Sequence, residues 1–439
     1  MGGNLGGIFI PALISVVLLA APNFPLPQAD NGRGLRLAVS VERESHFYTL
    51  GDSAGFEIEI QGLKSAGELS YRFSLEKAST VAESTRQVNN GRLRLSGALG
   101  QPGFLRLDLT LAAGADTLRA AESAGFSPEA IRPTGVRPSD YRRFWQQGRA
   151  ELLRIPADPQ IISHPEADTA GTRRYLVSLA NIEGSRIYGW LSVPAGEGPF
   201  PAVVHIPGAP GGINEFHTPA HRAYAEAGMI VLVINIHGVP LGREDSYYRQ
   251  LQSLGFMGGF PELGIDDRYR YYYRRVVLGA VRAVDYLAGR SDVDTSRIGL
   301  GGESQGGGLS LLLASIDRRI KAVTLHVPAM CDLTGVFYGR PTGWPHPLDS
   351  SSSAEARRTV SYFDGALAAG LIETPTLVSV SLLDEACPPT TVWAAYNSLA
   401  GPKRIDVFPG TTHPASFTVE RDKRMVDWMA QTLSAKGGN

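Results

Sequence analysis

The sequence of 439 residues contains only two cysteines, Cys331 and Cys387. Two cysteines cannot form the disulfide framework of a small secreted domain. An exported protein could still pair them, but we expect two buried thiols near the functional site. Clustered cysteine and histidine ligands are also absent. His217 and His221 have an i,i+4 spacing, but Pro219 lies between them and no glutamate follows the first histidine, so no metal is expected.

An excess of charge of one sign is lacking as well, because 42 basic and 43 acidic residues give a net charge of −1. This balance gives no electrostatic reason to expect nucleic acid or an anionic membrane as a partner. No phosphate loop or dinucleotide fingerprint is present, so no cofactor is expected. The length allows two or three domains, and the 43% of apolar residues is enough for a large core.

The sequence has no apolar run long enough to cross a membrane comfortably. Residues 8–21 form a shorter apolar run that is followed by a Pro-rich tail, although no Lys or Arg precedes it. This pattern predicts a signal peptide over residues 1–29, with cleavage after Ala29 and no membrane contact afterwards. The protein is therefore expected to be exported, to the periplasm or outside the cell. The alternative is an uncleaved N-terminal anchor.

Residues 30–118 are predicted to form a small immunoglobulin-like β-sandwich. The expected strands alternate apolar and polar residues, with Gly, Asn and Asp turns between them, and cover residues 35–41, 54–60, 69–75, 92–95 and 104–111. This domain carries no obvious chemistry. Its expected role is that of a spacer or an assembly surface, with a carbohydrate-binding module as the alternative.

The predicted linker covers residues 119–137, where the sequence is first rich in Ala and Gly and then in Pro. Residues 138–439 are predicted to form an α/β domain. A helix over 140–153, with Ser139 as its N-cap, should precede a series of strands and helices. The strands are expected at 175–179, 187–193, 202–206 and 229–236, and the helices at 221–228 and 271–287. Such alternation indicates a mostly parallel sheet covered by helices.

The motif that organises this domain is Gly302-Glu303-Ser304-Gln305-Gly306, between a short apolar strand and an apolar helix. Gly-x-Ser-x-Gly at such a junction is the nucleophile elbow of the α/β-hydrolase fold. The serine is held in a strained turn, where side chains at the two glycines would collide with neighbouring elements. Ser304 is therefore the predicted nucleophile.

A serine needs a base and a carboxylate, and in this fold they follow in the order Ser, Asp/Glu, His. Asp384 follows the predicted strand 376–381, and His413 follows the predicted strand 404–408. His413 is the only histidine after the acid, so the order selects it as the base. Glu385 and Asp332 remain alternatives to Asp384 as the acid.

Two backbone N–H groups are expected to bind the oxyanion. Gln305 begins the helix after the serine, so its N–H points to developing negative charge. The second donor should come from the loop after the strand 202–206, where proline has no N–H to donate and Ala209 is the remaining candidate. His205, at the end of that strand, is expected to brace the loop rather than to transfer protons.

Longer stretches of the second domain resemble one family, the acetyl xylan esterases and cephalosporin-C deacetylases of carbohydrate esterase family 7. The likeness covers about residues 138–435. It rests on residues 271–274, 280–287 and 390–397, and on the motifs Gly302-Glu303-Ser304-Gln305-Gly306-Gly307-Gly308, Val327-Pro328-Ala329-Met330-Cys331-Asp332 and Asp384-Glu385-Ala386-Cys387-Pro388-Pro389. The resemblance implies removal of acetyl groups from xylo-oligosaccharides or related small acetyl esters. It implies Ser304, Asp384 and His413 as the triad, and a homo-oligomer.

Three departures from the family's pattern concern the surroundings of the triad. His237-Gly238-Val239 stands where Arg-Gly-Gln is usual, Pro414 where glutamate is usual, and Ala209 where tyrosine is usual. A backbone donor survives the last change, but a side-chain wall of the acyl pocket does not. Aromatic residues of two insertions, 240–268 and 334–360, are expected to shape the pocket: Tyr247, Tyr248, Phe256, Phe260, Phe337, Tyr338 and Trp344.

Two other functions are compatible with the same motifs. A serine peptidase of the prolyl-oligopeptidase type shares the fold and the triad order, but it usually carries a propeller, which a domain of this size cannot supply. A carbohydrate-binding protein built on an inactive hydrolase fold is the non-enzymatic alternative. The intact serine, acid and histidine argue against it.

Overall fold

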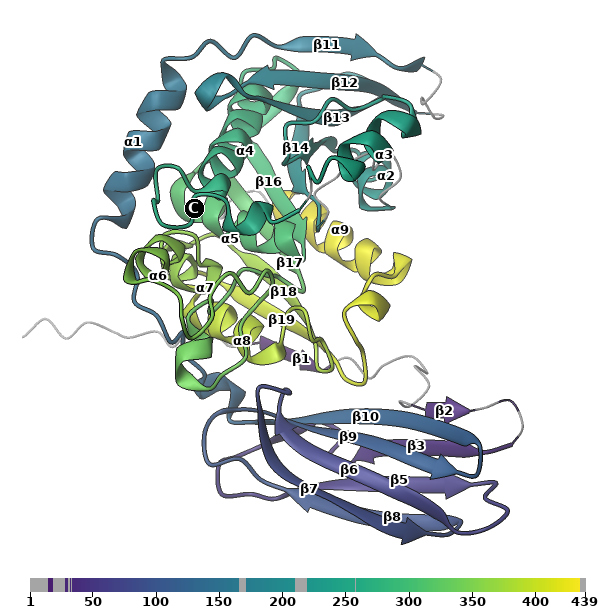
Figure 1. The fold of residues 1–439 in the computed structure, drawn as a ribbon. Helices are drawn as coiled ribbons and strands as arrows, with labels where there is room; N and C mark the ends of the chain where they lie inside the picture. Colours follow the sequence, from purple (N-terminus) through teal and green to yellow (C-terminus); the bar gives the residue numbers. More distant parts are fainter. Residues whose placement is uncertain are drawn as a thin grey trace, which may run out of the picture.

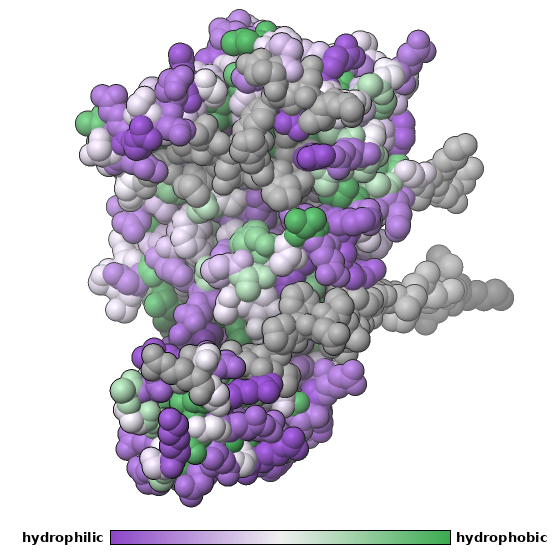
Figure 2. Space-filling view, turned by 90° about the vertical axis from the view of Figure 1, so that its right-hand side faces the viewer, coloured by the Kyte–Doolittle hydropathy of each residue, from purple (hydrophilic) through white to green (hydrophobic). Residues whose placement is uncertain are grey.

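The computed structural model describes residues 15–18, 28–30, 32, 34–165, 171–209, 219–256 and 258–434. They form a small all-β lobe and a larger lobe of strands and helices, which lie end to end (Figures 1 and 2). None of the helices described is long and apolar enough to cross a membrane.

The predicted signal peptide, residues 1–29, lies outside the described residues except for 15–18 and 28–29. The backbone of β1 (Ser15–Leu18) runs parallel to β19 (Lys403–Phe408) at one edge of the large sheet. The strand β2 (Gln28–Asp30) pairs with β3 (Arg36–Val41) in the small lobe. Cleavage after Ala29 would divide β2, and it stays a prediction.

The small lobe is a sandwich of two sheets, as the alternating sequence predicts. One sheet has the order β2, β3, β5 (Ala54–Gln61) and β8 (Gly91–Gly97). The other has the order β4 (Phe47–Tyr48), β10 (Asp116–Phe126), β9 (Gly103–Ala113), β6 (Gly67–Leu75) and β7 (Ser79–Val88). Neighbours are antiparallel except β4 and β10. One face of each sheet is buried against the other in a shared apolar core.

The last strand of the sandwich crosses the predicted boundary at residue 118. β10 continues to Phe126, so the first part of the predicted linker 119–137 is a strand. Its small residues are needed for packing, since a Cβ on Gly125 would lie 2.8 Å from the Phe104 ring and 2.9 Å from the Phe47 ring. The connection to the large lobe therefore begins after Phe126.

The large lobe is built on one mixed sheet with the order β1, β19, β18, β17, β16, β14, β15, β13, β12, β11. Pairing is parallel from β1 to β15 and antiparallel from β15 to β11. The strands are β11 (Gln160–Ser163), β12 (Thr172–Ala180), β13 (Arg186–Pro194), β14 (Phe200–Ile206), β15 (Ile230–Asn235), β16 (Val293–Glu303), β17 (Ile320–His326) and β18 (Thr376–Ser381).

Helices cover both faces of this sheet, as its sequence predicts. α1 (Tyr141–Leu153), α4 (Tyr272–Ala288), α5 (Gln305–Ile316) and α8 (Pro389–Ser398) share one apolar core with the sheet. α2 (Pro219–Glu226) and α9 (Val419–Ser434) share a second core on the other face. The shorter α3 (Asp245–Ser253), α6 (Ala354–Val360) and α7 (Gly365–Ala368) lie in the connections. The first helix begins at Tyr141, with Asp140 rather than Ser139 at its N-cap.

Candidate active site

Ser304 occupies a strained turn between β16 and α5. The strand ends at Glu303, the helix begins at Gln305, and Ser304 itself has φ 49° and ψ −119°. A Cβ on Gly302 would lie 2.4 Å from the Gly306 carbonyl oxygen, and one on Gly306 would lie 1.8 Å from the Ile206 carbonyl oxygen. Both glycines are therefore required by close approach of backbone, and the turn has the geometry of a nucleophile elbow.

Asp384 and His413 meet where β18 and β19 end. Asp384 Oδ2 accepts a hydrogen bond of 2.7 Å from His413 Nδ1. Its other oxygen accepts the N–H groups of Ala386 at 2.9 Å and Cys387 at 2.8 Å. Because Nδ1 donates to the carboxylate, Nε2 of the neutral ring is left as an acceptor, which is the tautomer that a general base needs.

The other two carboxylates that the sequence leaves open as the acid are engaged elsewhere. Glu385 points to the sandwich, where it pairs with Lys77 at 2.8 Å and Arg106 at 3.0 Å. Asp332 is fully buried and accepts hydrogen bonds from the N–H and hydroxyl of Thr134 at 2.6 and 2.7 Å. The carboxylate that holds the histidine is Asp384.

The Cys387 thiol lies close to the side chains of Ser304, Asp384 and His413. Ser304 Oγ lies 4.0 Å from Cys387 Sγ. One ligand atom each of Asp384, Cys387 and His413 lie within 4.8 Å of one another. Both cysteines of the chain are unpaired and buried, as expected. Burial raises the pKa of the Cys387 thiol well above its usual value. The thiol is therefore neutral at neutral pH, and the carboxylate and the imidazole of this trio already bind each other.

The loop with the second expected oxyanion donor lies against the nucleophile. A Cβ on Gly208 would lie 3.3 Å from Ser304 Cβ, and Ala209 follows. Glu303 braces this loop: its Oε1 accepts the Gly208 N–H at 3.3 Å, and its Oε2 pairs with His205 Nε2 at 2.7 Å. Gln305 is the first residue of α5, so its N–H has no partner within the helix.

The Glu303 carboxyl is ionised, which strengthens its contacts with His205 and the Gly208 N–H. Burial would raise the pKa of its carboxyl, but the His205 ring and the Gly208 N–H outweigh burial and hold the pKa below its usual value. His205 thus acts on the loop through Glu303, which agrees with its expected role.

Comparisons with known proteins decide the family. The model of the acetyl xylan esterase (AXE1) family matches residues 129–432. The chain belongs to this family. It is therefore a carboxylic ester hydrolase with an α/β-hydrolase fold.

Relatives of this esterase include acetyl esterase Axe7A of Xylanibacter ruminicola, which is 29% identical over 373 residues, 83% of this chain and 84% of the relative. Residues 129–439 make up less than 83% of the chain, so the aligned region must extend into the sandwich. The structure of an acetyl xylan esterase from Paenibacillus sp. R4 has a TM-score of 0.59 and 28% identity, and covers 69% of this chain and 98% of that one. Acetyl xylan esterase 1 of Thermoanaerobacterium sp. JW/SL YS485 also has a TM-score of 0.59, with 22% identity over 70% and 98%.

His326 supports the histidine of this esterase, a role that no sequence motif indicates. It is buried between Ser379 Oγ, 2.7 Å from Nδ1, and the Ser416 carbonyl, 3.1 Å from Nε2. Burial lowers the pKa of His326 to about 4, so the ring stays neutral. Ser416 lies in the turn that begins at Pro414, and its N–H and hydroxyl both donate to the His413 carbonyl. Pro414, in place of the usual glutamate, thus begins a turn that holds the base.

The aromatic insertions are only partly placed near the site. Phe260 is buried beside Trp344, at 6.3 Å between ring centroids, and His237, at 4.8 Å. His237 Nδ1 lies 2.6 Å from the Tyr272 hydroxyl. The backbone of Trp344 binds that of Ala386, next to Cys387, with a distance of 2.7 Å. By contrast, the predicted pocket residues Phe256 and Tyr338 are exposed.

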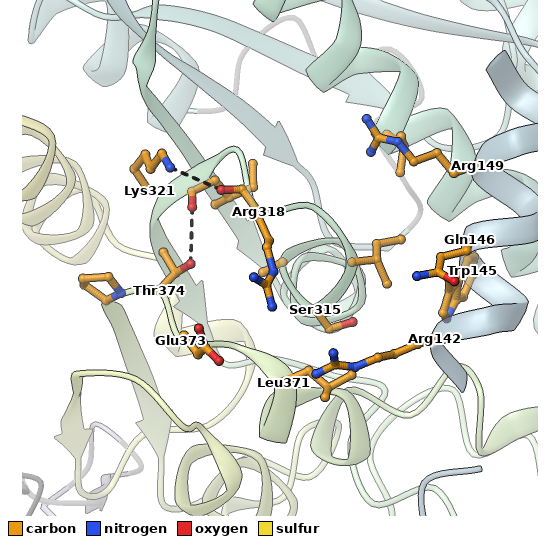
Figure 3. Close-up of a pocket in the computed structure, with 15 residues that line it drawn as sticks. Arg142, Trp145, Gln146, Arg149, Ser315, Arg318, Lys321, Leu371, Glu373 and Thr374 are labelled. Carbon is orange, nitrogen blue, oxygen red and sulfur yellow. Dashed lines mark hydrogen bonds between the residues drawn. The ribbon is translucent and has the colours of Figure 1, made fainter. Parts of the chain in front are cut away.

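A separate cavity of about 500 Å³ lies at the other ends of the strands, away from Ser304, Asp384 and His413 (Figure 3). It is formed near the first residues of β17 and β18, whereas the serine, acid and histidine follow the last residues of their strands. Its charged lining residues are Arg142, Arg149, Arg318, Lys321 and Glu373. Arg149 is already paired with Asp317 at 3.2 Å. The cavity is therefore not part of the candidate active site.

Proposed function

We propose that this protein is a serine esterase that removes acetyl groups from acetylated xylo-oligosaccharides or related small acetyl esters through an acetyl-serine intermediate. The observation that carries the proposal is the 2.7 Å hydrogen bond between Asp384 and His413, which leaves Nε2 free to act as the base for the serine on the strained elbow. Membership of the acetyl xylan esterase family and the similarity to Axe7A, an acetyl esterase, support the choice of acetyl esters.

The first step requires Ser304 Oγ, which lies 4.0 Å from Cys387 Sγ, to reach Nε2 of His413. The imidazole takes the hydroxyl proton as Oγ attacks the ester carbonyl. Asp384 stabilises the imidazolium that forms. His413 then protonates the departing sugar oxygen, and an acetyl-serine remains.

The oxyanion of this step would be held by the N–H groups of Gln305 and Ala209. Gln305 begins α5 directly after the serine, and Ala209 follows Gly208, on which a Cβ would lie 3.3 Å from Ser304 Cβ. Each such donor is worth roughly 3 kcal/mol of transition-state stabilisation. Water activated by the same histidine then releases acetate and restores the serine.

The test compares acetate release from acetylated xylo-oligosaccharides and 4-nitrophenyl acetate with hydrolysis of a butyrate ester and a peptide. We expect rapid acetate release, slower butyrate hydrolysis and no peptide cleavage. Ser304→Ala should abolish turnover and labelling by a fluorophosphonate while the fold persists. Undiminished turnover by Ser304→Ala would remove the serine mechanism, and preferred cleavage of the peptide would favour a peptidase.

Export is a second part of the proposal, supported by the apolar run at residues 8–21. N-terminal sequencing of the protein recovered from its native host tests it. A mature N-terminus at Asp30 is expected, and a retained Met1 would overturn it.

A further inference from the structure

The sandwich is packed against two loops of the esterase domain that carry catalytic residues. The acid loop, residues 382–388, follows β18 and contains Asp384. The histidine loop, residues 409–413, follows β19 and ends at His413. Figure 1 shows the sandwich beside the part of the larger lobe that holds α8 and the edge of the sheet with β1 and β19.

Arg106 of β9 holds the acid loop on both sides of Asp384. Its guanidinium donates to the Leu383 carbonyl at 3.4 Å and pairs with Glu385 at 3.0 Å. Asp108 fixes the same guanidinium from within the sandwich at 2.9 Å. Only 7% of Arg106 is exposed, whereas the Glu385 side chain is 54% exposed, so the guanidinium is the shielded partner of this contact.

The turn between β6 and β7 makes a second contact with the same loop. Lys77 pairs with Glu385 at 2.8 Å, and Glu76 accepts the Thr390 N–H at 2.9 Å at the start of α8. Both turn residues have positive φ, 47° for Glu76 and 67° for Lys77. Such consecutive positions usually hold Asn-Gly, because other side chains are strained there. The strained turn therefore brings the Glu76 and Lys77 side chains into contact with Thr390 and Glu385.

Glu122 of β10 contacts the histidine loop. This buried carboxyl group accepts the Ser123 N–H at 2.9 Å, and the Gly410 N–H lies close enough to lower its pKa. Gly410 lies three positions before His413 in the chain. Beside it, the Phe47 ring packs edge-on against Trp393 of α8 at 5.8 Å. The domain contact thus combines polar contacts to both loops with an apolar contact to the helix.

We propose that the sandwich is a positioning element of the esterase site, in which Arg106 and the Glu76–Lys77 turn fix Asp384 and Glu122 fixes the histidine loop. This role rests on the proposed serine mechanism. Asp384 and His413 orient one another through a single hydrogen bond, so a small shift of either loop misaligns the base. The serine elbow, by contrast, is packed against the esterase domain's own backbone.

The first test replaces Arg106 by leucine in the full-length protein. We expect kcat for 4-nitrophenyl acetate and the rate of fluorophosphonate labelling to fall about 10- to 100-fold, with KM changed less than threefold. Arg106→Lys should recover part of the loss. The matched control is Arg72→Leu, which removes an exposed pair with Glu83 on the same sheet and should leave both rates unchanged.

The second test separates positioning from folding. Replacing Glu76 with asparagine and Lys77 with glycine relieves the strained turn, so thermal stability of the sandwich should stay or rise. The same variant loses the contacts to Glu385 and Thr390, so kcat and the labelling rate should fall about fivefold or more. A rise in stability with a fall in kcat is not expected of a merely structural contact.

Wild-type values of kcat and labelling rate in both Arg106→Leu and the turn variant, with the wild-type enzyme active on acetyl esters, would overturn this role for the sandwich. Failure of the proposed function has a different signature. In that case the wild-type protein itself would neither release acetate nor react with the fluorophosphonate.

Discussion

The serine and its two partners are held in place in different ways. Ser304 is fixed by tight backbone packing within the esterase domain, where Gly306 leaves no room for a side chain. Asp384 and His413 lie on loops whose outer sides meet a different domain. The proposed nucleophile is thus positioned by residues close in sequence, and the proposed acid and base by a surface that is distant in sequence. The following changes test that contrast.

Asp384→Asn should have the largest effect, a loss of about 10⁴-fold in kcat, because an amide cannot hold the imidazole in the required tautomer. Stability should change little, since the amide oxygen can still accept the N–H groups of Ala386 and Cys387. Steady-state kinetics and thermal unfolding check this outcome. A mild loss would remove Asp384 from the role of the acid.

Gly306→Ala tests whether close backbone packing fixes the serine elbow. The new methyl group would collide with the Ile206 carbonyl, so the elbow must move. We expect a loss of about 100-fold in kcat and a destabilisation on the order of 2–3 kcal/mol. Gly100→Ala, whose Cβ meets nothing within 4 Å, is the matched control. Equal behaviour of the two variants would show that the elbow is not held by close packing.

Glu303→Gln tests the support of the oxyanion loop. The amide keeps the shape of the side chain but loses the charge that pairs with His205. We expect about a tenfold loss in kcat, and less in KM, because Ala209 would be held less firmly. Chemical denaturation alongside the kinetics shows whether the loss follows stability instead. An unchanged kcat would remove Glu303 from the support of this loop.

Glu122 predicts a smaller effect, on the pH dependence of stability, at the contact between the domains. Burial raises the pKa of its carboxyl from 4.5 to about 8, although N–H groups of Ser123 and Gly410 oppose the shift. The folded protein therefore binds more protons than the unfolded chain between these values. The stability from this group is complete below pH 4.5 and is lost as the pH rises through 8. Glu122→Gln should flatten this slope in unfolding measured from pH 5 to 9. An identical slope in both proteins would contradict the assignment.

The parts of the fold that the sequence predicts best are strands with one buried face. The alternating apolar residues of β5 and the continuous apolar run of β15 indicate these strands directly. β7 could not be found in this way, because nearly all of its side chains are exposed. Most of β10 falls in the predicted linker because its Ala and Gly residues have little preference for strands, and the rings of Phe47 and Phe104 explain the glycine at position 125.

The candidate site shows the same limit. Ser304, Asp384 and His413 can be found because each follows a predicted strand and their order is that of the fold. The structure brings Asp384 and His413 into contact, whereas no motif indicates that Cys387 lies beside the serine. The supporting residues Arg106 and His326 act through contacts with residues far away in the chain, and a single sequence contains no pattern for such contacts.

The order of the two domains along the chain has a consequence for biosynthesis. The sandwich is complete at Phe126, whereas Asp384 and His413 follow much later in the chain and leave the ribosome after it. Domains generally fold as units during translation, the N-terminal one first. The nascent chain would thus meet a finished template when its acid and histidine loops emerge, and moving the sandwich to the C-terminus by circular permutation would remove that head start.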